Sequence, residues 1–220
     1  MTNNEIFNHI DHTLLKATSS WVDIKKLCDE AMQYHTASVC VPPSYIARIH
    51  ASYPQLNICT VIGFPLGYNT TETKAAEIHQ AVAEGANEVD MVVNLGDVKN
   101  GDFDKITTEI AALKAAAGKH ILKVIVETCY LTEDEKVKLC GCVSRAGADY
   151  IKTSTGFGTG GATIEDIKLF KANIDKNVKM KAAGGVKTKD DLEHFLAEGC
   201  ERIGTSSAVA ILNGAEAKGY

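Results

Sequence analysis

The chain has 220 residues, 45% of them apolar and 23% charged, with a formal net charge of −5 at pH 7. A chain of this length can bury one large core, and this composition excludes a disordered chain and a small fold held together by disulfides. The acidic balance, without any block of lysine or arginine, argues against a nucleic-acid partner, and no apolar run approaches the roughly 18 residues that a membrane span needs.

Eight short β-rich runs recur along the chain, each followed by a turn-rich connection and a segment that can form a helix. The predicted strands are Ile10–Leu14, Ala37–Val41, Ile58–Phe64, Glu88–Val93, Ile121–Glu127, Tyr150–Ser154, Val178–Ala183 and Arg202–Thr205. Thr132 and Glu135 have capping-box spacing at the start of one helix, and Gly85 stands where the helix opened by Thr71 should end. No low-complexity linker divides the chain, so we expect residues 1–220 to form one domain.

The alternation of eight strands with helices predicts an α/β fold, a single-domain (β/α)8 barrel of the TIM type. A doubly wound open sheet is the alternative, because alternation alone does not establish closure. The count of eight favours the barrel, and no glycine-rich fingerprint follows the first strand. A G-x-G-x-x-G match at Gly156–Gly161 lies past the middle of the chain, so we interpret it as a flexible active-site loop rather than a dinucleotide site.

Several predicted strands carry charges where strands of a parallel barrel should be apolar. Strand alternation puts these charges on the faces opposite the apolar residues, so we expect them in the barrel lumen: Asp90, Lys123, Glu127, Lys152 and Lys181. Charges inside a barrel are unfavourable unless they are paired, so the set marks a site. A structural ion-pair network is the plainer alternative, but three lysines facing two acids outnumber their partners.

Depth in the barrel separates the three lysines. Lys152 and Lys181 lie close below the ends of the sixth and seventh strands, where the active sites of barrels are found, whereas Lys123 is deeper and is interpreted as structural. Crowded lysines lower one another's pKa values, and a neutral amine in a pocket attacks carbonyls to form a Schiff base. We therefore predict that one of Lys152 and Lys181 is the nucleophile and the other perturbs it, with Asp90 facing both.

Connections rich in glycine and hydroxyl groups follow the seventh and eighth strands, where barrels often bind phosphate through backbone N–H groups. Tight turns without a ligand are the alternative for each glycine pair. Thr155 and Gly156, after the sixth strand, are expected near the same phosphate. The other candidates are three glycines, two serines and one lysine of these connections: Gly184, Gly185, Lys187, Gly204, Ser206 and Ser207.

Metal binding and secretion are not expected. The seven histidines show no metal-binding spacing, and Cys140 and Cys142 diverge on a predicted helix. Seven cysteines without a secretory signal predict free thiols and a cytoplasmic location.

Some residues near the predicted site have two interpretations each. Cys40 and Cys59 are expected as small core residues. The alternative for Cys40 is that it lines the mouth of the pocket. His12 and Asp11 are interpreted as a core pair, or Asp11 orders water in the lumen. Tyr220 is either a frayed tail or a cover over the mouth that assists proton transfer.

The motifs on these strands resemble those of deoxyribose-phosphate aldolases, the class I lyases that form a Schiff base on a (β/α)8 barrel. The resemblance covers nearly the whole chain, from IDHTLL through VIGFPLG, GANEVDMVVN, LKVIVET, GADYIKTSTGF and KAAGGVKT to RIGTSS. It implies the reversible aldol cleavage of 2-deoxy-D-ribose 5-phosphate to D-glyceraldehyde 3-phosphate and acetaldehyde. Neither a metal nor an organic cofactor is implied.

The resemblance also implies a role for each candidate catalytic residue. Lys152, in YIKTSTG, is the Schiff-base lysine; Lys181, in KAAGG, tunes it and assists proton transfer; Asp90, in EVDMVVN, is the proton-relay acid. The glycines and serines named above hold the substrate phosphate. Phe157 is a departure, because some relatives have a lysine there close to the phosphate; its absence either weakens the affinity for phosphate or leaves Lys187 to compensate.

Two other classes of function stay open. The first is another phosphate-binding barrel enzyme that uses non-covalent acid/base catalysis, which borohydride trapping would distinguish because it forms no imine. The second is a non-catalytic sugar-phosphate-binding module, in which Lys152→Ala would barely alter affinity. A homo-oligomer is also left open, since interface residues cannot be told from ordinary surface in a sequence.

Overall fold

The structure, a computed structural model, describes residues 1–217. Eight parallel strands close into a barrel in sequence order, with β1 paired to both β2 and β8. The fold is therefore the predicted (β/α)8 barrel, and the open-sheet alternative is excluded. The strands are β1 (Ile10–Thr13), β2 (Ser38–Val41), β3 (Ile58–Ile62), β4 (Glu88–Val92), β5 (Ile121–Ile125), β6 (Tyr150–Lys152), β7 (Lys179–Ala183) and β8 (Arg202–Thr205).

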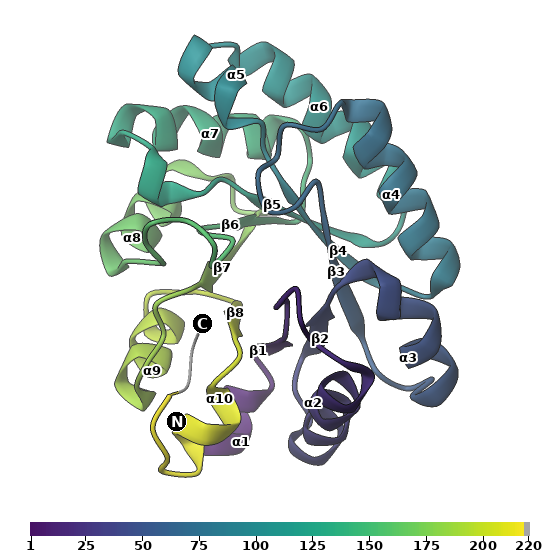
Figure 1. Cartoon of the computed structure of the whole chain (residues 1–220). Helices are drawn as coiled ribbons and strands as arrows, with labels where there is room; N and C mark the ends of the chain where they lie inside the picture. The colour runs from purple at the N-terminus through teal and green to yellow at the C-terminus, as the bar shows by residue number, and fades with distance from the viewer. Residues whose placement is uncertain (218–220) are drawn as a thin grey trace.

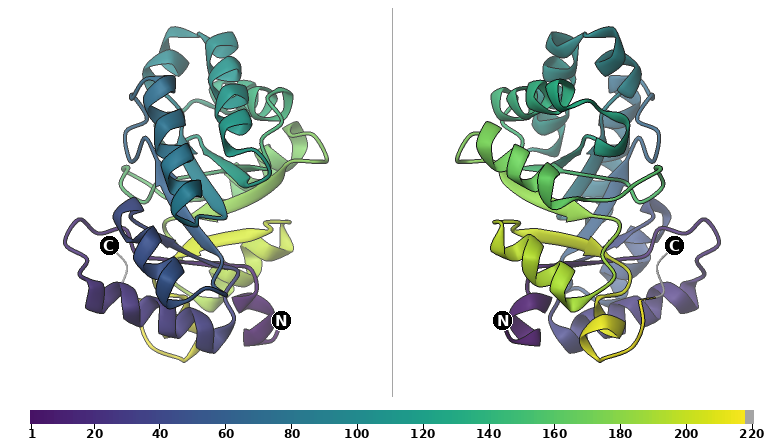
Figure 2. Two further views of the ribbon diagram at one scale, coloured as in Figure 1. Left: turned by 90° about the vertical axis from the view of Figure 1, so that its right-hand side faces the viewer. Right: turned by 90° about the vertical axis from the view of Figure 1, so that its left-hand side faces the viewer.

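Helices surround the barrel on its outside (Figure 1). They are α2 (Trp21–Tyr34), α3 (Ile46–Ser52), α4 (Thr71–Glu84), α5 (Leu95–Asn100), α6 (Phe103–Ala117), α7 (Glu133–Arg145), α8 (Ile164–Asn173) and α9 (Lys189–Ala197), with 3-10 turns η1 (Pro43–Tyr45) and η2 (Thr128–Tyr130). The short helices α1 (Asn3–Phe7) and α10 (Ala208–Leu212) lie side by side (Figure 2). There the Asn3 side-chain amide donates to the Leu212 carbonyl at 2.7 Å. No helix within residues 1–217 has both the length and the apolar character of a membrane span.

The helix ends follow the capping signals of the sequence. The Thr132 side chain accepts from the Glu135 N–H and the Glu135 carboxylate accepts from the Thr132 N–H, which completes the predicted capping box of α7. Helix α4 ends at Gly85, whose φ of 112° is left-handed. A Cβ at Gly85 would come within 2.5 Å of the His50 ring, so glycine is required there for packing as well as for conformation.

Strand alternation divides the barrel into an apolar outer layer and a charged lumen. Val89, Met91, Leu122 and Val124 are fully buried in the main core between the barrel and the helices, while their neighbours along each strand point inward. The outer layer therefore stabilises the fold, because apolar burial contributes about 25 cal/mol per Å². The inner layer is left for chemistry.

Five strands end earlier than predicted, β1 and β4 by one residue and β3, β5 and β6 by two. β3 stops at Ile62 and β5 at Ile125, because Gly63 and Glu127 have positive φ values of 59° and 55° that interrupt the extended ladder. A left-handed glutamate is unusual, and it turns the chain out of the barrel wall before the predicted strand is complete. This changes where the Glu127 side chain lies.

Candidate active site

Asp90 on β4 is the centre of a buried cluster of charges in the lumen. Its Oδ1 accepts from Lys123 Nζ at 2.9 Å, and its Oδ2 accepts from Lys152 Nζ at 2.7 Å and Lys181 Nζ at 2.8 Å. All four residues are at most 3% exposed. Burial alone would raise the pKa of Asp90, but the three ammonium groups outweigh it and hold the pKa well below its usual range. The structure thus brings the three candidate catalytic residues together, because Lys152 and Lys181 both contact the Asp90 carboxylate.

Asp11 on β1 supplies a second buried carboxylate to the same cluster. Lys181 Nζ donates to its Oδ2, while Arg202 and Ser38 donate to its Oδ1, each at 2.8 Å. Burial alone would raise the pKa of Asp11, but Lys123, Lys181 and Arg202 lower it. Asp11 therefore stays ionised and is a second carboxylate, beside Asp90, that holds Lys181.

The predicted core pair of His12 with Asp11 is wrong. Consecutive residues of a strand point to opposite faces, so Asp11 enters the lumen and His12 points outward. His12 Nε2 lies 2.8 Å from Glu30 Oε2 on helix α2. The strand register, rather than adjacency in the sequence, decides the partner of each residue.

Glu88 and Arg202 form a floor beneath this cluster that the sequence analysis missed. Arg202 donates to both Glu88 oxygens at 3.1 Å, and Lys123 contacts Glu88 as well. A signal for Glu88 exists, because it precedes Asp90 by two residues and so shares its face of β4. Arg202 carries the same kind of signal, because it begins β8 and alternates with Ile203 of the outer core.

The charges of the lumen balance when one amine is neutral. Four cations face three carboxylates within the described chain: Lys123, Lys152, Lys181 and Arg202 against Asp11, Glu88 and Asp90. Burial alone would lower the pKa values of Lys123 and Lys181, but Asp11 and Asp90 outweigh it and raise both. Lys123 does lower the pKa of Lys181, as crowding predicts, but the two carboxylates outweigh this effect, so the predicted net lowering is wrong for these two lysines. Lys152 contacts Asp90 alone among the described carboxylates, so it is the lysine least committed to an ion pair.

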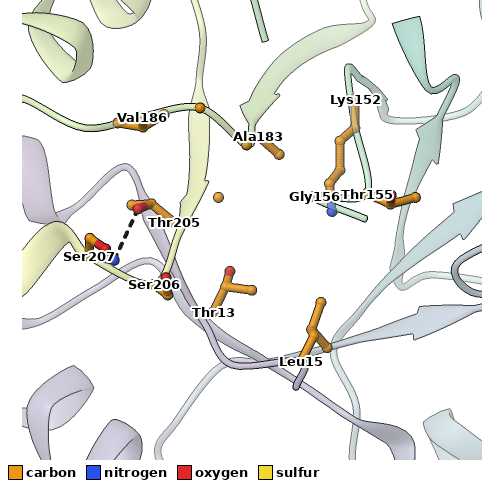
Figure 3. A pocket seen from close by; sticks show the side chains of 13 residues that line it. Thr13, Leu15, Lys152, Thr155, Gly156, Ala183, Val186, Thr205, Ser206 and Ser207 are labelled. Atoms are coloured by element: carbon orange, nitrogen blue, oxygen red, sulfur yellow. Dashed lines mark hydrogen bonds between the residues drawn. The ribbon is translucent and has the colours of Figure 1, made fainter. Parts of the chain in front are cut away.

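A pocket of about 80 Å³ opens above the cluster, with Lys152 on one wall (Figure 3). Seven of the eight predicted substrate-binding residues line it: Thr155, Gly156, Gly184, Gly185, Gly204, Ser206 and Ser207. Thr13, Leu15, Ala183, Val186 and Thr205 also line it and were missed. Figure 3 shows Lys152 across the pocket from Ser206 and Ser207, so an amine and a hydroxyl-rich wall face each other.

The hydroxyl-rich wall is built from the loops after β7 and β8. Gly184 and Gly185 have φ values of 75° and 76°, a left-handed conformation in which glycine is favoured. A Cβ on Gly161 would lie 2.4 Å from the Gly184 carbonyl carbon, so the loop after β6 approaches this turn closely. Ser207 N–H donates to Thr205 Oγ1 at 3.1 Å, which orders the second loop (Figure 3). Small residues therefore keep the wall open to a ligand.

Lys187 and Phe157 lie outside this lining. Lys187 is exposed, and its backbone N–H donates to Asp191 Oδ2 at 2.9 Å at the start of α9. Phe157 is 47% exposed and packs edge-on against Phe64, with ring centroids 5.4 Å apart. Neither the predicted lysine nor the residue that replaces the relatives' lysine is placed in the pocket wall.

Glu127 does not join the lysines, contrary to the prediction. Its carboxylate accepts from the Thr155 N–H at 3.1 Å and from the Thr155 hydroxyl. The left-handed turn at Glu127 directs the side chain toward the loop after β6, instead of into the lumen. Glu127 thereby holds Thr155 in the pocket wall.

The buried ion pairs predict a definite dependence of stability on pH. Asp11 and Asp90 have lowered pKa values, so their contribution is present above about pH 4 and is lost as the pH falls through their folded-state values. Lys123 and Lys181 have raised values, so theirs is present below about pH 10 and is lost above it. We expect the urea midpoint to fall steeply below pH 4 and to change less in Asp11→Asn. A midpoint that rises on acidification would contradict this arrangement.

Comparisons with known proteins agree with this architecture. A family model described as DeoC/LacD family aldolase matches residues 6–215. A protein of Clostridium botulinum (strain Eklund 17B / Type B) named deoxyribose-phosphate aldolase is 64% identical over 100% of both chains, and one of Clostridioides difficile with the same name is 57% identical over 98% of this chain and 99% of that one.

Solved structures of similarly named proteins superpose on the barrel. One from Coccidioides immitis has a TM-score of 0.93 at 38% identity and covers 97% of this chain and 86% of its own. One from Aeropyrum pernix, a deoxyribose phosphate aldolase, has a TM-score of 0.89 at 29% identity and covers 96% and 91%. With a family model matching almost the whole length and relatives this similar, the chain belongs to the DeoC/LacD family of aldolases.

Proposed function

We propose that the chain catalyses the reversible aldol cleavage of 2-deoxy-D-ribose 5-phosphate to D-glyceraldehyde 3-phosphate and acetaldehyde. The observation that carries this proposal is the position of Lys152, which lines the pocket and contacts Asp90 at the same time. The relatives named deoxyribose-phosphate aldolase support the choice of substrate. A cytoplasmic location is part of the proposal, since all seven cysteines are free and a reducing compartment preserves thiols.

Lys152 is the nucleophile of the proposed mechanism. Its neutral amine attacks C1 of the open-chain sugar, and loss of water leaves an iminium that withdraws electrons. Removal of the proton from the C3 hydroxyl then lets the C2–C3 bond break, which releases glyceraldehyde 3-phosphate and leaves an enamine on Lys152. Protonation of the enamine carbon and hydrolysis of the resulting imine release acetaldehyde and restore the amine.

Asp90 and Lys181 move the protons in this mechanism. Oδ2 of Asp90 contacts both Lys152 Nζ and Lys181 Nζ, so one oxygen connects the reacting nitrogen with the Lys181 amine. Asp11 also accepts from Lys181 and keeps it in place. General acid–base catalysis by positioned groups typically increases the reaction rate 10²–10⁴-fold, and we attribute a rate increase of this size to Asp90 and Lys181 together.

The opposite wall holds the phosphate. Gly184, Gly185, Ser206 and Ser207 line the pocket from two loops, and backbone N–H groups and hydroxyls of such loops bind phosphate in barrels. A sugar phosphate can then extend from the loops to Lys152, with its aldehyde at the amine. This supports an aldolase over a binding module, which has no use for a buried amine beside a shared acid.

The direct test is an assay of cleavage. Purified protein is given 2-deoxyribose 5-phosphate, and acetaldehyde is followed by its reduction with NADH and alcohol dehydrogenase. We expect rapid formation of acetaldehyde and glyceraldehyde 3-phosphate, with much slower cleavage of 2-deoxyribose. Tight binding without products would indicate the binding module instead. Isomerised sugar phosphate as the sole product would indicate a non-covalent barrel enzyme.

A negative charge on the hydroxyl-rich wall should weaken binding of the phosphorylated substrate. Ser206→Asp is expected to raise KM for 2-deoxyribose 5-phosphate about tenfold or more, because like charges a few ångströms apart repel by several kcal/mol at the effective dielectric of a protein surface. The KM for unphosphorylated 2-deoxyribose should change little. Lys187→Ala is the matched control, and its kinetics should resemble the wild type because the side chain is exposed outside the pocket lining.

We also propose that the protein forms a homo-oligomer. The support is that the Aeropyrum pernix relative is described as tetrameric. Light scattering on the purified chain should give a mass that is a multiple of 23.6 kDa. A mass equal to one chain at micromolar concentration would reject the proposal.

The sequence-based prediction that Tyr220 covers the mouth of the site concerns a residue that lies outside the described part of the chain.

A further inference from the structure

Cys40 and Cys59 are neighbours in the barrel wall. They are register partners on the adjacent parallel strands β2 and β3, and both are fully buried. Their Sγ atoms and one Asp90 oxygen all lie within 4.8 Å of one another. Neighbouring strands are about 4.8 Å apart, and disulfides span Cα separations of roughly 4.4–6.8 Å. The two sulfurs can therefore be joined by side-chain rotation without moving a strand.

The two thiols differ in reactivity. The hydrogen bond with Cys59 lowers the pKa of Cys40, and the charges of Lys181 and Lys152 act in the same direction, while burial and Asp90 oppose them. Burial, the hydrogen bond with Cys40 and the charge of Asp90 raise the pKa of Cys59 well above its usual range. Thiolates are the nucleophilic form of cysteine, so Cys40 attacks first and Cys59 is placed to resolve the product.

The pair lies directly behind the substrate pocket. Cys40, Cys59, Leu15 and Val61 form a small apolar cluster of their own, and Leu15 lines the pocket. Leu15 thus joins the cluster of the two thiols to the pocket lining, and buried thiols are reached more readily by a small neutral oxidant than by a bulky thiol reagent.

Other buried cysteines of the chain lack this setting. Cys28, Cys140 and Cys200 belong to the core around the barrel, and burial raises the pKa of each to about 12. Their thiols stay protonated at neutral pH and react slowly. They provide matched controls for the pair in the barrel.

We propose that Cys40 and Cys59 form a reversible intramolecular disulfide on exposure to hydrogen peroxide, and that this modification inactivates the enzyme. The Cys40 thiolate attacks one peroxide oxygen, the O–O bond breaks, and hydroxide leaves, which takes up a proton to form water. The sulfur of Cys59 then displaces hydroxide from the Cys40 sulfenic acid, and the Cys59 proton leaves with it as a second water. The two thiols lose two electrons in total, and peroxide gains them.

The disulfide would disturb the charge cluster. Cys59 Sγ donates to Asp90 Oδ1 at 3.1 Å and accepts from Lys123 Nζ at 3.2 Å. Oxidation removes the S–H donor and pulls the sulfur toward Cys40, so Asp90 loses a partner on the side away from Lys152. Hydrogen bonds to charged groups have large effects, and we expect turnover to fall about tenfold or more.

The experiment treats the full chain with hydrogen peroxide and reads out chemistry and activity separately. Mass spectrometry of the intact protein should show the loss of two hydrogens, and non-reducing peptide mapping should find Cys40 linked to Cys59. Activity should fall in step with the cross-link and return with dithiothreitol. The cross-link is measured without any turnover, so its absence would overturn this inference while leaving the aldolase proposal untouched.

Two variants locate the effect, each compared with its own reduced sample. Cys40→Ser should lose the cross-link and resist peroxide, whereas Cys28→Ser should form the cross-link and lose activity as the wild type does. Equal sensitivity of Cys40→Ser and wild type would overturn the proposal. So would a peptide map that shows oxidation at other cysteines or links between chains. If Cys40→Ser fails to fold, the wild-type peptide map alone decides the matter.

Discussion

Replacing Lys152 by methionine should lower the rate of aldol cleavage by about 10³-fold or more, because no imine can form without the amine. The fold should survive the change. Asp90 keeps its contacts with Lys123 and Lys181, at 2.9 Å and 2.8 Å, so no carboxylate is left unpaired. A methionine side chain also fills nearly the same volume as lysine, which avoids a cavity.

The measurement is kcat and KM for 2-deoxyribose 5-phosphate, with circular dichroism to check the fold. Lys179→Met is the matched control, since Lys179 begins β7, is exposed, and has weak contacts, with Glu201 at 3.5 Å and with the Tyr150 ring at 5.7 Å from its centroid. It should be as active as the wild type. Substantial cleavage by Lys152→Met would show that another amine, or no amine at all, performs the reaction.

Replacing Asp90 by asparagine should damage activity and stability together. The variant loses the oxygen that joins Lys152 to Lys181, so kcat should fall by about 10²–10⁴-fold, the usual contribution of a positioned acid or base. It also removes the buried carboxylate that accepts from Lys123 at 2.9 Å. Breaking a buried ion pair by removal of one partner costs about 3–5 kcal/mol, so the free energy of unfolding should drop by a similar amount.

Urea unfolding and steady-state kinetics separate the two effects. Asp97→Asn is the control, because Asp97 pairs with the exposed Lys105 at 2.8 Å on the surface, and such pairs contribute at most about 1 kcal/mol. A variant Asp90→Asn that is as stable and as active as the wild type would contradict the central place given to this carboxylate.

The eight-strand barrel and the meeting of Asp90, Lys152 and Lys181 could be predicted from the sequence. The apolar outer face of each strand is visible as alternation, and a charge on the opposite face has no place to go except the lumen. The position of Lys123 in its strand also predicts that it lies deeper than the other two lysines. In the structure it pairs with Asp90 and Glu88 below the pocket.

Other parts of the site depend on barrel closure, which a linear pattern does not contain. Asp11 reaches Lys181 and Arg202 only because β1 pairs with β8, at the far end of the chain. The raised pKa of Lys181 follows from that closure, since it combines Asp11 with Asp90. The predicted position of Glu127 in the lumen is wrong for a local reason, because its left-handed backbone conformation ends the strand before it and places it in a loop.

The most direct test of the account is reduction of the proposed imine with sodium borohydride in the presence of acetaldehyde, followed by peptide mapping. An N-ethyl group confined to Lys152 is the predicted result, because Lys152 lines the pocket while the raised pKa of Lys181 keeps that amine charged. The same group on Lys181 would exchange the two lysine roles. A folded, unmodified protein would contradict covalent catalysis and favour an acid/base enzyme on the same barrel.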